Sequence, residues 1–394
     1  MTTTQPQGVT YPKGFRAAGV TAGQRAGDGP DLALVVNVGA HASAAAVFTT
    51  NRFAAAPVLW SRNVLASGAT PTVVVLNAGG ANACTGHDGL AQTVATAQQA
   101  AEVIGRQSGQ VMVCSTGLIG KLLDLDPLLA GVRSAAATMS ADGGADAARA
   151  IMTTDTYPKT VELDLAGWRM GGMAKGAGMI APGLATLLVV VTTDALTDNA
   201  TAQRALAQAA DATFNRIDVD GCMSTNDTLI LLASGESGVR VTQDGLAKAV
   251  TQACHNLSQQ CVGDAEGASH EIAITVEGAT SEDAALAVAR AIARSNLFKC
   301  AVFGNDPNWG RILSAAGTVP PEVAPFDADR VDVSINGVMV CQGGGVGEPR
   351  ERVVMAGQRR VDVRVDLHAG GADATVYTND LTYDYVKENA EYSS

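Results

Sequence analysis

Residues 171–193 have the sequence GGMAKGAGMIAPGLATLLVVVTT, in which a glycine-rich segment leads directly into a β-branched run. We predict that Gly171–Gly183 is a loop, because glycine tolerates positive φ and the close approach of other atoms. The run Thr186–Thr193 predicts a buried central strand, because valine and threonine favour strands. Such a loop can cradle a phosphate, make a tight turn or present a strained peptide bond.

The spacing of the glycines argues against phosphate binding. The segment has no G-x-x-x-x-G-K-[ST] match, and Gly176-x-Gly178 lacks the third glycine of a dinucleotide-binding loop. A plain turn before a strand remains open. So does a third alternative, in which the chain cuts its own Ala185–Thr186 bond. Thr186 would then carry both a hydroxyl nucleophile and an α-amine that acts as its base, with an ordinary pKa of about 7.7–8.0.

Short strands and helices alternate irregularly along the rest of the chain, which favours α+β layers over a doubly wound sheet. Apolar or alternating runs predict strands at Leu32–Gly39, Ala45–Thr50, Thr72–Leu76, Gln110–Cys114, Val161–Trp168, Thr228–Ala233, Glu271–Glu277, Val331–Asn336, Val353–Ala356, Val361–Leu367 and Ala374–Tyr377. Helical spacing predicts helices at Leu90–Ile104, Asp126–Met139, Asp146–Met152, Ala200–Phe214, Gln243–Gln259 and Glu282–Ser295.

Composition excludes several classes of function. The net charge is −12 and no Lys/Arg-rich run occurs, so nucleic acid is not an expected partner. The seven cysteines include no C-x-x-C pair, which disfavours a disulfide framework or a thiolate metal site. The N-terminus does not match a signal peptide, and no apolar stretch approaches the roughly 18 residues that span a membrane. We therefore expect a cytoplasmic protein.

Residues 171–188 resemble the cleavage-site motif of the ornithine acetyltransferase (ArgJ) family, the bifunctional glutamate N-acetyltransferases of arginine biosynthesis. The resemblance runs nearly the full length of the chain. Its further motifs are CSTGLIG at 114–120, AIMTTDTYPK at 150–159, STNDT at 224–228, DAEGA at 264–268, FGNDPNWGR at 303–311 and ENAEYSS at 388–394. Each motif is weak alone, but their order and spacing together are highly specific.

The resemblance implies an α+β fold of layered sheets and helices, similar to the N-terminal-nucleophile arrangement and of the ArgJ/DmpA type. It also implies autocleavage between Ala185 and Thr186, which gives an α chain of residues 1–185 and a β chain of residues 186–394. The two chains are expected to form one intertwined unit and to assemble as α2β2 or larger.

The resemblance assigns roles residue by residue. Thr186 matches the nucleophile, and Thr116 and Gly117 match the pair that stabilises the oxyanion; the alternative for this pair is a strand-to-helix turn with Ser115 or Thr116 as N-cap. Substrate-binding positions are matched by Thr153, Lys175, Thr186, Glu266, Asn389 and Ser394. Asn226, Asp227, Asp306 and Trp309 are expected near the site or at an interface, without a catalytic role.

The implied reaction moves an acetyl group from N2-acetylornithine to L-glutamate through acetyl-Thr186, releasing ornithine and then N-acetylglutamate. It needs no metal and no bound cofactor, although some family members also accept acetyl-CoA as donor. Three alternatives stay open: a self-processing aminopeptidase or amidohydrolase of similar fold, a paralogue serving secondary metabolism, and an uncleaved protein that binds acetylated amino acids.

Overall fold

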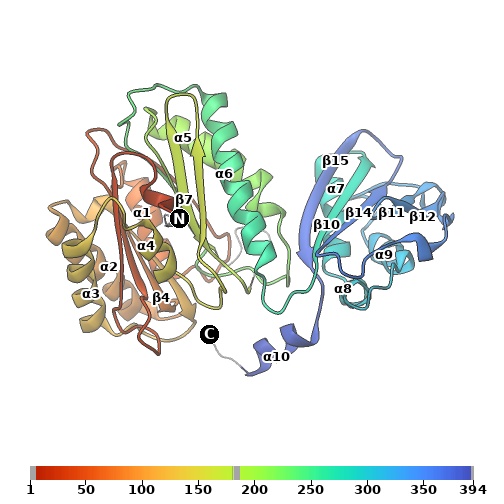
Figure 1. Cartoon of the computed structure of the whole chain (residues 1–394), viewed down its shortest axis with the longest axis horizontal. Coiled ribbons are helices and arrows are strands. Elements are labelled where there is room, and N and C mark those ends of the chain that lie inside the picture. The colour runs from red at the N-terminus through yellow and green to blue at the C-terminus, as the bar shows by residue number, and fades with distance from the viewer. Residues whose placement is uncertain (1–5, 180, 182–186, 392–394) are drawn as a thin grey trace, which may run out of the picture. The chain divides into compact units, whose positions relative to one another are not determined.

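The computed structural model describes residues 6–179, 181 and 187–391 (Figure 1). The predicted cleavage pair Ala185 and Thr186, and the predicted binding residue Ser394, lie outside the described residues. The chain folds into two compact units. The first runs to Asn215 and continues with Cys222–Asp264; the second contains Arg216–Gly221 and the chain from Ala265 onward.

The first unit contains two sheets. One has the order β1-β2-β4-β5, in which only the β4–β5 pair is parallel. The other has the order β3-β9-β8-β7-β6, in which only the β8–β9 pair is parallel. The strands are β1 Phe15–Val20, β2 Leu32–Asn37, β3 Ser43–Phe48, β4 Val73–Gly80, β5 Val111–Leu118, β6 Lys159–Asp164, β7 Arg169–Lys175, β8 Leu188–Thr193 and β9 Thr228–Ala233.

Helices cover the outer faces of these two sheets, giving four layers within the first unit (Figure 1). The inner core between the sheets includes Leu76, Met112, Met173 and Ile230. Helices α2 and α3 pack on the first sheet, and α5 and α6 pack on the second. The helices of this unit are α1 Ala56–Ala66, α2 Gly86–Ile104, α3 Leu125–Thr138, α4 Gly144–Ala150, α5 Asn199–Ala212 and α6 Gln243–Gly263.

The second unit has one sheet, of order β13-β12-β11-β14-β10-β15, and its own core. Burial alternates along β14, as expected for a sheet with one covered face. Its elements are β10 Glu271–Ala279, α7 Glu282–Ala293, α8 Asn296–Phe303, α9 Trp309–Ala316, β11 Asp332–Ile335, β12 Val338–Gln342, β13 Gly345–Val346, β14 Arg360–Asp366, β15 Ala372–Asn379 and α10 Tyr383–Glu391. Single 3₁₀ turns occur at η1 Gly8–Thr10, η2 Ser108–Gln110, η3 Phe214–Arg216, η4 Ala328–Arg330 and η5 Arg350–Arg352.

The layered α+β architecture confirms the predicted fold class, but two local predictions are wrong and a third, a strand that is present, is too short. The predicted loop Gly171–Gly183 begins inside strand β7. Its glycines serve packing here, because a Cβ on Gly171 would lie 2.0 Å from the Gly8 carbonyl oxygen. The predicted strand Gln110–Cys114 extends to Leu118, and Val353–Ala356 is not a strand, since Val353 follows the 3₁₀ turn η5.

Other predicted elements are present with ends shifted by a few residues, and β9 matches its predicted bounds. The sequence prediction missed β1, β7, α1, α8, β12, β13, α9 and α10. These are mostly short elements, in which too few residues repeat to reveal a period.

Candidate active site

A buried lysine contacts Thr116, one member of the predicted oxyanion pair. Lys175 ends strand β7 and is 2% exposed, and its Nζ donates a hydrogen bond of 3.3 Å to Thr116 Oγ1 in strand β5. Because an ammonium group only donates, Thr116 accepts, and its own hydroxyl proton stays available for an oxyanion. Lys175 also pairs with Leu188 across the sheet, two residues after Thr186 in the chain. The structure therefore brings two predicted site residues together beside the start of β8.

Gly117 lies in β5 with a φ of +127°, a conformation that side chains rarely adopt. A Cβ at this position would lie 2.5 Å from the Gly79 carbonyl carbon and 2.6 Å from the Gly80 nitrogen. The close approach of β4 therefore requires glycine here. No helix starts at this point, since α3 begins at Leu125 after Asp124, so the N-cap alternative for Ser115 or Thr116 is wrong.

Asn226 supports this strand from the loop before β9. Its Nδ2 donates to the carbonyl oxygens of Ala81 at 2.6 Å and Ser115 at 2.8 Å. Ser115 also donates from its hydroxyl to Asn77 Oδ1 at 2.6 Å. Asn226 thus holds the backbone immediately before Thr116, a role that its sequence motif did not reveal.

Asp227 anchors the residue that follows the predicted nucleophile. Its Oδ1 accepts a hydrogen bond of 2.9 Å from the Leu187 N–H, and the Leu187 carbonyl accepts from the Thr228 N–H at 2.9 Å. Burial raises the pKa of the Asp227 carboxyl well above its ordinary value, and the Leu187 N–H and the charge of Lys175 offset only part of this rise. Burial therefore disfavours the ionised form of the Asp227 carboxyl.

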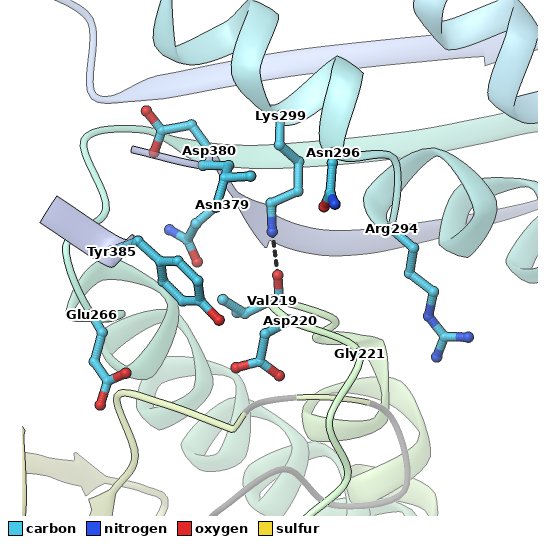
Figure 2. A pocket seen from close by; sticks show the side chains of 11 residues that line it. Val219, Asp220, Gly221, Glu266, Arg294, Asn296, Lys299, Asn379, Asp380 and Tyr385 are labelled. Carbon is cyan, nitrogen blue, oxygen red and sulfur yellow. Dashed lines mark hydrogen bonds between the residues drawn. The ribbon is translucent and has the colours of Figure 1, made fainter. Parts of the chain in front are cut away.

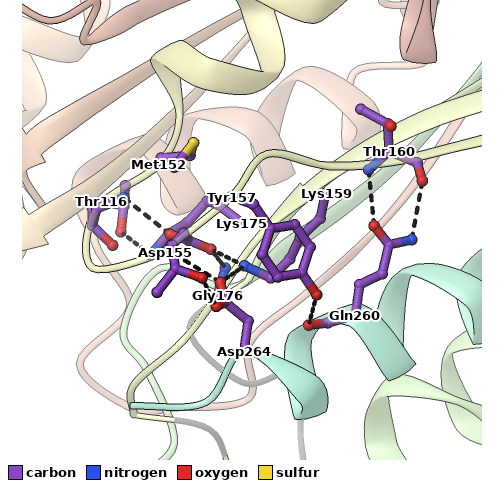
Figure 3. Close-up of polar contacts among 12 residues, drawn as sticks. Thr116, Met152, Asp155, Tyr157, Lys159, Thr160, Lys175, Gly176, Gln260 and Asp264 are labelled. Atoms are coloured by element: carbon purple, nitrogen blue, oxygen red, sulfur yellow. Dashed lines mark hydrogen bonds and ion pairs between the residues drawn. The ribbon is translucent and has the colours of Figure 1, made fainter. Parts of the chain in front are cut away.

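Thr153 lies in the loop after α4 and joins a polar network around Asp155, whose contacts with Lys159 and Gly176 are drawn in Figure 3. Its N–H donates to Asp155 Oδ2 at 3.0 Å. The other oxygen, Asp155 Oδ1, accepts from the Gly176 N–H at 2.7 Å and from Lys159 Nζ at 2.6 Å. One carboxylate therefore joins the segments that carry Thr153 and Lys175.

Glu266 and Asn389 come together in the second unit, where Asn389 Nδ2 donates to Glu266 Oε2 at 3.1 Å. Asn389 is exposed on α10, and Glu266 is half-buried at the wall of a cavity of about 260 Å³ (Figure 2). Asp220, Tyr385 and Lys299 also line this cavity. Burial lowers the pKa of Lys299, although the nearby Asp220 and Asp218 offset part of the effect.

A cluster of Ser269, His270 and Asp380 in the second unit does not have the geometry of a hydrolytic triad. Ser269 Oγ lies 3.0 Å from His270 Nδ1, and Asp380 Oδ2 lies 2.8 Å from the same nitrogen. A triad requires the serine and the carboxylate on opposite ring nitrogens. The Asp380 carboxylate also accepts the N–H groups of Ser269 and His270, so the cluster ties β10 to the end of β15. Within the described ranges, no group of three His, Cys, Asp or Glu could hold a metal ion.

With this geometry established, comparison with known proteins decides the family. The ArgJ family model matches residues 16–394. The chain belongs to the ArgJ family. It is 59% identical over 391 residues to the arginine biosynthesis bifunctional protein ArgJ of Bifidobacterium longum, covering 98% of this chain and 100% of the relative. The ArgJ protein of Streptomyces coelicolor is 58% identical over 386 residues, again covering 98% and 100%.

Among solved structures, ornithine acetyltransferase from Mycobacterium tuberculosis, complexed with ornithine, is 53% identical in sequence. That comparison covers 45% of this chain and 95% of the other, with a TM-score of 0.44. Family membership confirms the resemblance predicted from the motifs. In the described part of this ArgJ chain, no helix has the length and apolar character needed to cross a membrane.

Proposed function

We propose that this chain transfers an acetyl group from N2-acetylornithine to L-glutamate, with Thr186 as nucleophile. The observation that carries the proposal is the contact between Lys175 and Thr116 beside Gly117, in a chain that matches the ArgJ family from residue 16 to 394. A buried ammonium suits the α-carboxylate of an amino-acid substrate. The Thr116 hydroxyl and the Gly117 N–H suit the oxyanion of acyl transfer.

In the first half-reaction, Thr186 Oγ attacks the acetyl carbonyl of N2-acetylornithine. The Oγ–carbon bond forms, the amide carbon–nitrogen bond breaks, and the hydroxyl proton passes through the Thr186 α-amine to the departing ornithine nitrogen. In the second half-reaction, the amine of glutamate attacks acetyl-Thr186 and returns the proton by the same route. Thr116 and Gly117 stabilise both tetrahedral intermediates.

The free amine of Thr186 arises in this proposal by autocleavage. The Thr186 hydroxyl attacks the Ala185 carbonyl, the peptide bond becomes an ester, and water hydrolyses the ester to leave residues 1–185 and 186–394. The two chains stay together and assemble as α2β2 or larger in the cytoplasm. No metal or bound cofactor takes part; acetyl-CoA is an additional donor for the same acetyl-enzyme, which would yield N-acetylglutamate directly.

Intact mass spectrometry of the wild type beside Thr186→Ala and Thr186→Ser tests the nucleophile. We expect two chains meeting at Ala185/Thr186 in the wild type, one intact chain in Thr186→Ala, and retained cleavage in Thr186→Ser because the hydroxyl remains. A single intact chain in every sample would contradict the proposal and favour a binding protein.

An assay with isotope-labelled acetylornithine tests the acceptor. We expect label in N-acetylglutamate only when glutamate is present, and label on the β chain when it is absent. Release of free acetate at the same rate with and without glutamate would instead identify an amidohydrolase.

A further inference from the structure

Lys159 opens strand β6 and is fully buried. Its Nζ lies 2.6 Å from Asp155 Oδ1 and 2.6 Å from Asp264 Oδ2, and 5.0 Å from the centre of the Tyr157 ring (Figure 3). The two carboxylates are also buried, with side chains 0% and 5% exposed. The cost of taking these charges out of water offsets much of their attraction, so the pairing is weak evidence of stabilisation and points to another role.

Asp155 indicates that role, because it is the meeting point of two predicted substrate-binding segments. Its two oxygens accept the N–H groups of Thr153 and Gly176, the latter being the residue after Lys175. Hydrogen bonds to an ionised acceptor are roughly twice as strong as neutral ones. The orientation of the Asp155 carboxylate therefore sets the backbone position of both segments.

The charges around Asp155 keep it ionised. Burial alone would raise the pKa of Asp155, but the positive charges of Lys175 and Lys159 outweigh burial and hold the pKa below its ordinary value. Burial likewise opposes the charge of Lys159, whose pKa is nevertheless raised by the Asp155 carboxylate and by Asp264. Cys261 faces the same cluster, and burial raises the pKa of its thiol to about 12, so it adds no charge at neutral pH.

Asp264 provides the second anchor for Lys159. It follows the last residue of α6, and its carboxylate accepts the N–H of Thr156 at 2.9 Å as well as the Thr156 hydroxyl. Lys159 is therefore fixed from the end of α6 and from the loop before β6 at once. This fixes where its ammonium can hold the Asp155 carboxylate.

We propose that Lys159 is a positioning residue for acetyl transfer: by bridging Asp155 and Asp264, it holds the carboxylate that sets the backbone at Thr153 and Lys175. The inference rests on the proposed function, since those two residues bind substrate there. Among the described residues, Lys175 is the other cation that lowers the pKa of Asp155, so without Lys159 the Asp155 carboxylate draws the Lys175 ammonium away from Thr116. Lys159 itself contacts no substrate.

The test compares full-length Lys159→Met with the wild type for cleavage, kcat, KM and pH dependence. We expect cleavage to persist and KM for N2-acetylornithine to rise about 10- to 100-fold, the size of effect that misplaced binding groups produce. The acid limb of kcat/KM should move to higher pH, because loss of the Lys159 charge lets burial raise the pKa of Asp155. An unchanged KM and acid limb in a folded, cleaved variant would overturn the inference.

Control variants separate positioning from stability. Val288→Ala leaves a cavity in the core of the second unit, to which no residue of this network belongs, and serves as the matched control for lost stability. Lys159→Arg retains the charge and should recover part of the loss in KM, and Asp264→Asn should give a smaller loss than Lys159→Met. If Lys159→Met does not fold, Lys159→Arg and Asp264→Asn are compared with the wild type instead. Equal KM changes in Val288→Ala and Lys159→Met at equal Tm would overturn the inference.

A direct measurement of ornithine binding tests the positioning role of Lys159 separately from the proposed function. Calorimetric titration of ornithine into cleaved wild type and Lys159→Met measures affinity without acetyl transfer. Wild type that binds ornithine but transfers no acetyl group would defeat the proposed function alone. Equal affinities of wild type and Lys159→Met would defeat the positioning role alone.

Discussion

The predicted substrate-binding residues fall into two regions with opposite physical character. In the first unit, Lys175 is buried and the backbone at Thr153 is held by the ionised Asp155. In the second unit, exposed Asn389 and half-buried Glu266 share one hydrogen bond. Buried charge pairs resist screening and hold their geometry without a ligand, whereas exposed polar pairs compete with water. The first region is therefore held more firmly than the second.

Of the substitutions that test this contrast, Lys175→Met should have the largest effect on activity. The substitution removes the ammonium that contacts Thr116 and leaves the nearby Asp155 and Asp227 carboxyls with less compensating charge. We expect kcat/KM for acetyl transfer to fall about 10³-fold, as when a buried charge partner and an oxyanion contact are lost together. Steady-state kinetics measure it, with the exposed Lys121→Met as control. A loss of only a few-fold would show that burial does not make Lys175 important.

Next in size is Gly117→Ala, which adds a methyl group against the β4 backbone at a φ of +127°. We expect kcat to fall about 10²- to 10³-fold, because the oxyanion donors of β5 must move. Gly120→Ala is a matched control, since Gly120 also has positive φ but has open space around its Cβ. If kcat falls by a similar factor in both variants, the cause is backbone strain and not the close approach of β4.

In the buried region, Asp227 should make the free energy of unfolding depend on pH. Its pKa is raised in the folded protein, so ionisation destabilises the fold as pH rises from the unfolded value of about 3.9 towards the folded pKa. Asp227→Asn removes this penalty and keeps an acceptor for Leu187. We expect the difference in free energy of unfolding, Asp227→Asn minus its parent, to increase by at least about 1 kcal/mol as pH rises across this window.

Urea unfolding at several pH values measures this difference, with both proteins in a Thr186→Ala background so that each stays one chain. Asp211→Asn serves as the control, because Asp211 is exposed at the surface of α5. Parallel pH curves for Asp227→Asn and its parent would show that Asp227 is not held at a raised pKa.

The smallest effect is expected in the exposed region. Asn389→Ala removes the exposed hydrogen bonds that Asn389 Nδ2 donates to Glu266 and to the Tyr385 carbonyl, and each such bond contributes only about 0.5–1.5 kcal/mol. We therefore expect a rise in KM of about 2- to 10-fold with kcat unchanged, measured beside Lys387→Ala on the same helix. A loss as large as that of Lys175→Met would erase the distinction between the two regions.

Local sequence patterns were sufficient for much of the fold. The apolar run Thr228–Ala233 predicted β9 with its observed bounds, and the helical spacing of Gln243–Gln259 predicted most of α6. Such runs carry their own periodicity and propensity, so neighbours in the sequence contain the information. Val353–Ala356 shows the limit, because a short β-branched run without a pairing partner stays irregular, and Val354 is 62% exposed.

The motifs also indicated which residues form the site, because their order identified the ArgJ family before any geometry was known. How those residues are held was decided only by the tertiary structure. Lys159 and Asp264 are 105 positions apart, and Lys175 and Thr116 are 59 apart, so no local pattern relates them. The glycines of β7 resemble a loop in the sequence because the reason for Gly171, its close contact with Gly8, also lies far away in the chain. Propensity and periodicity act over a few residues, whereas burial, charge pairing and close backbone approach exist only once distant segments have packed.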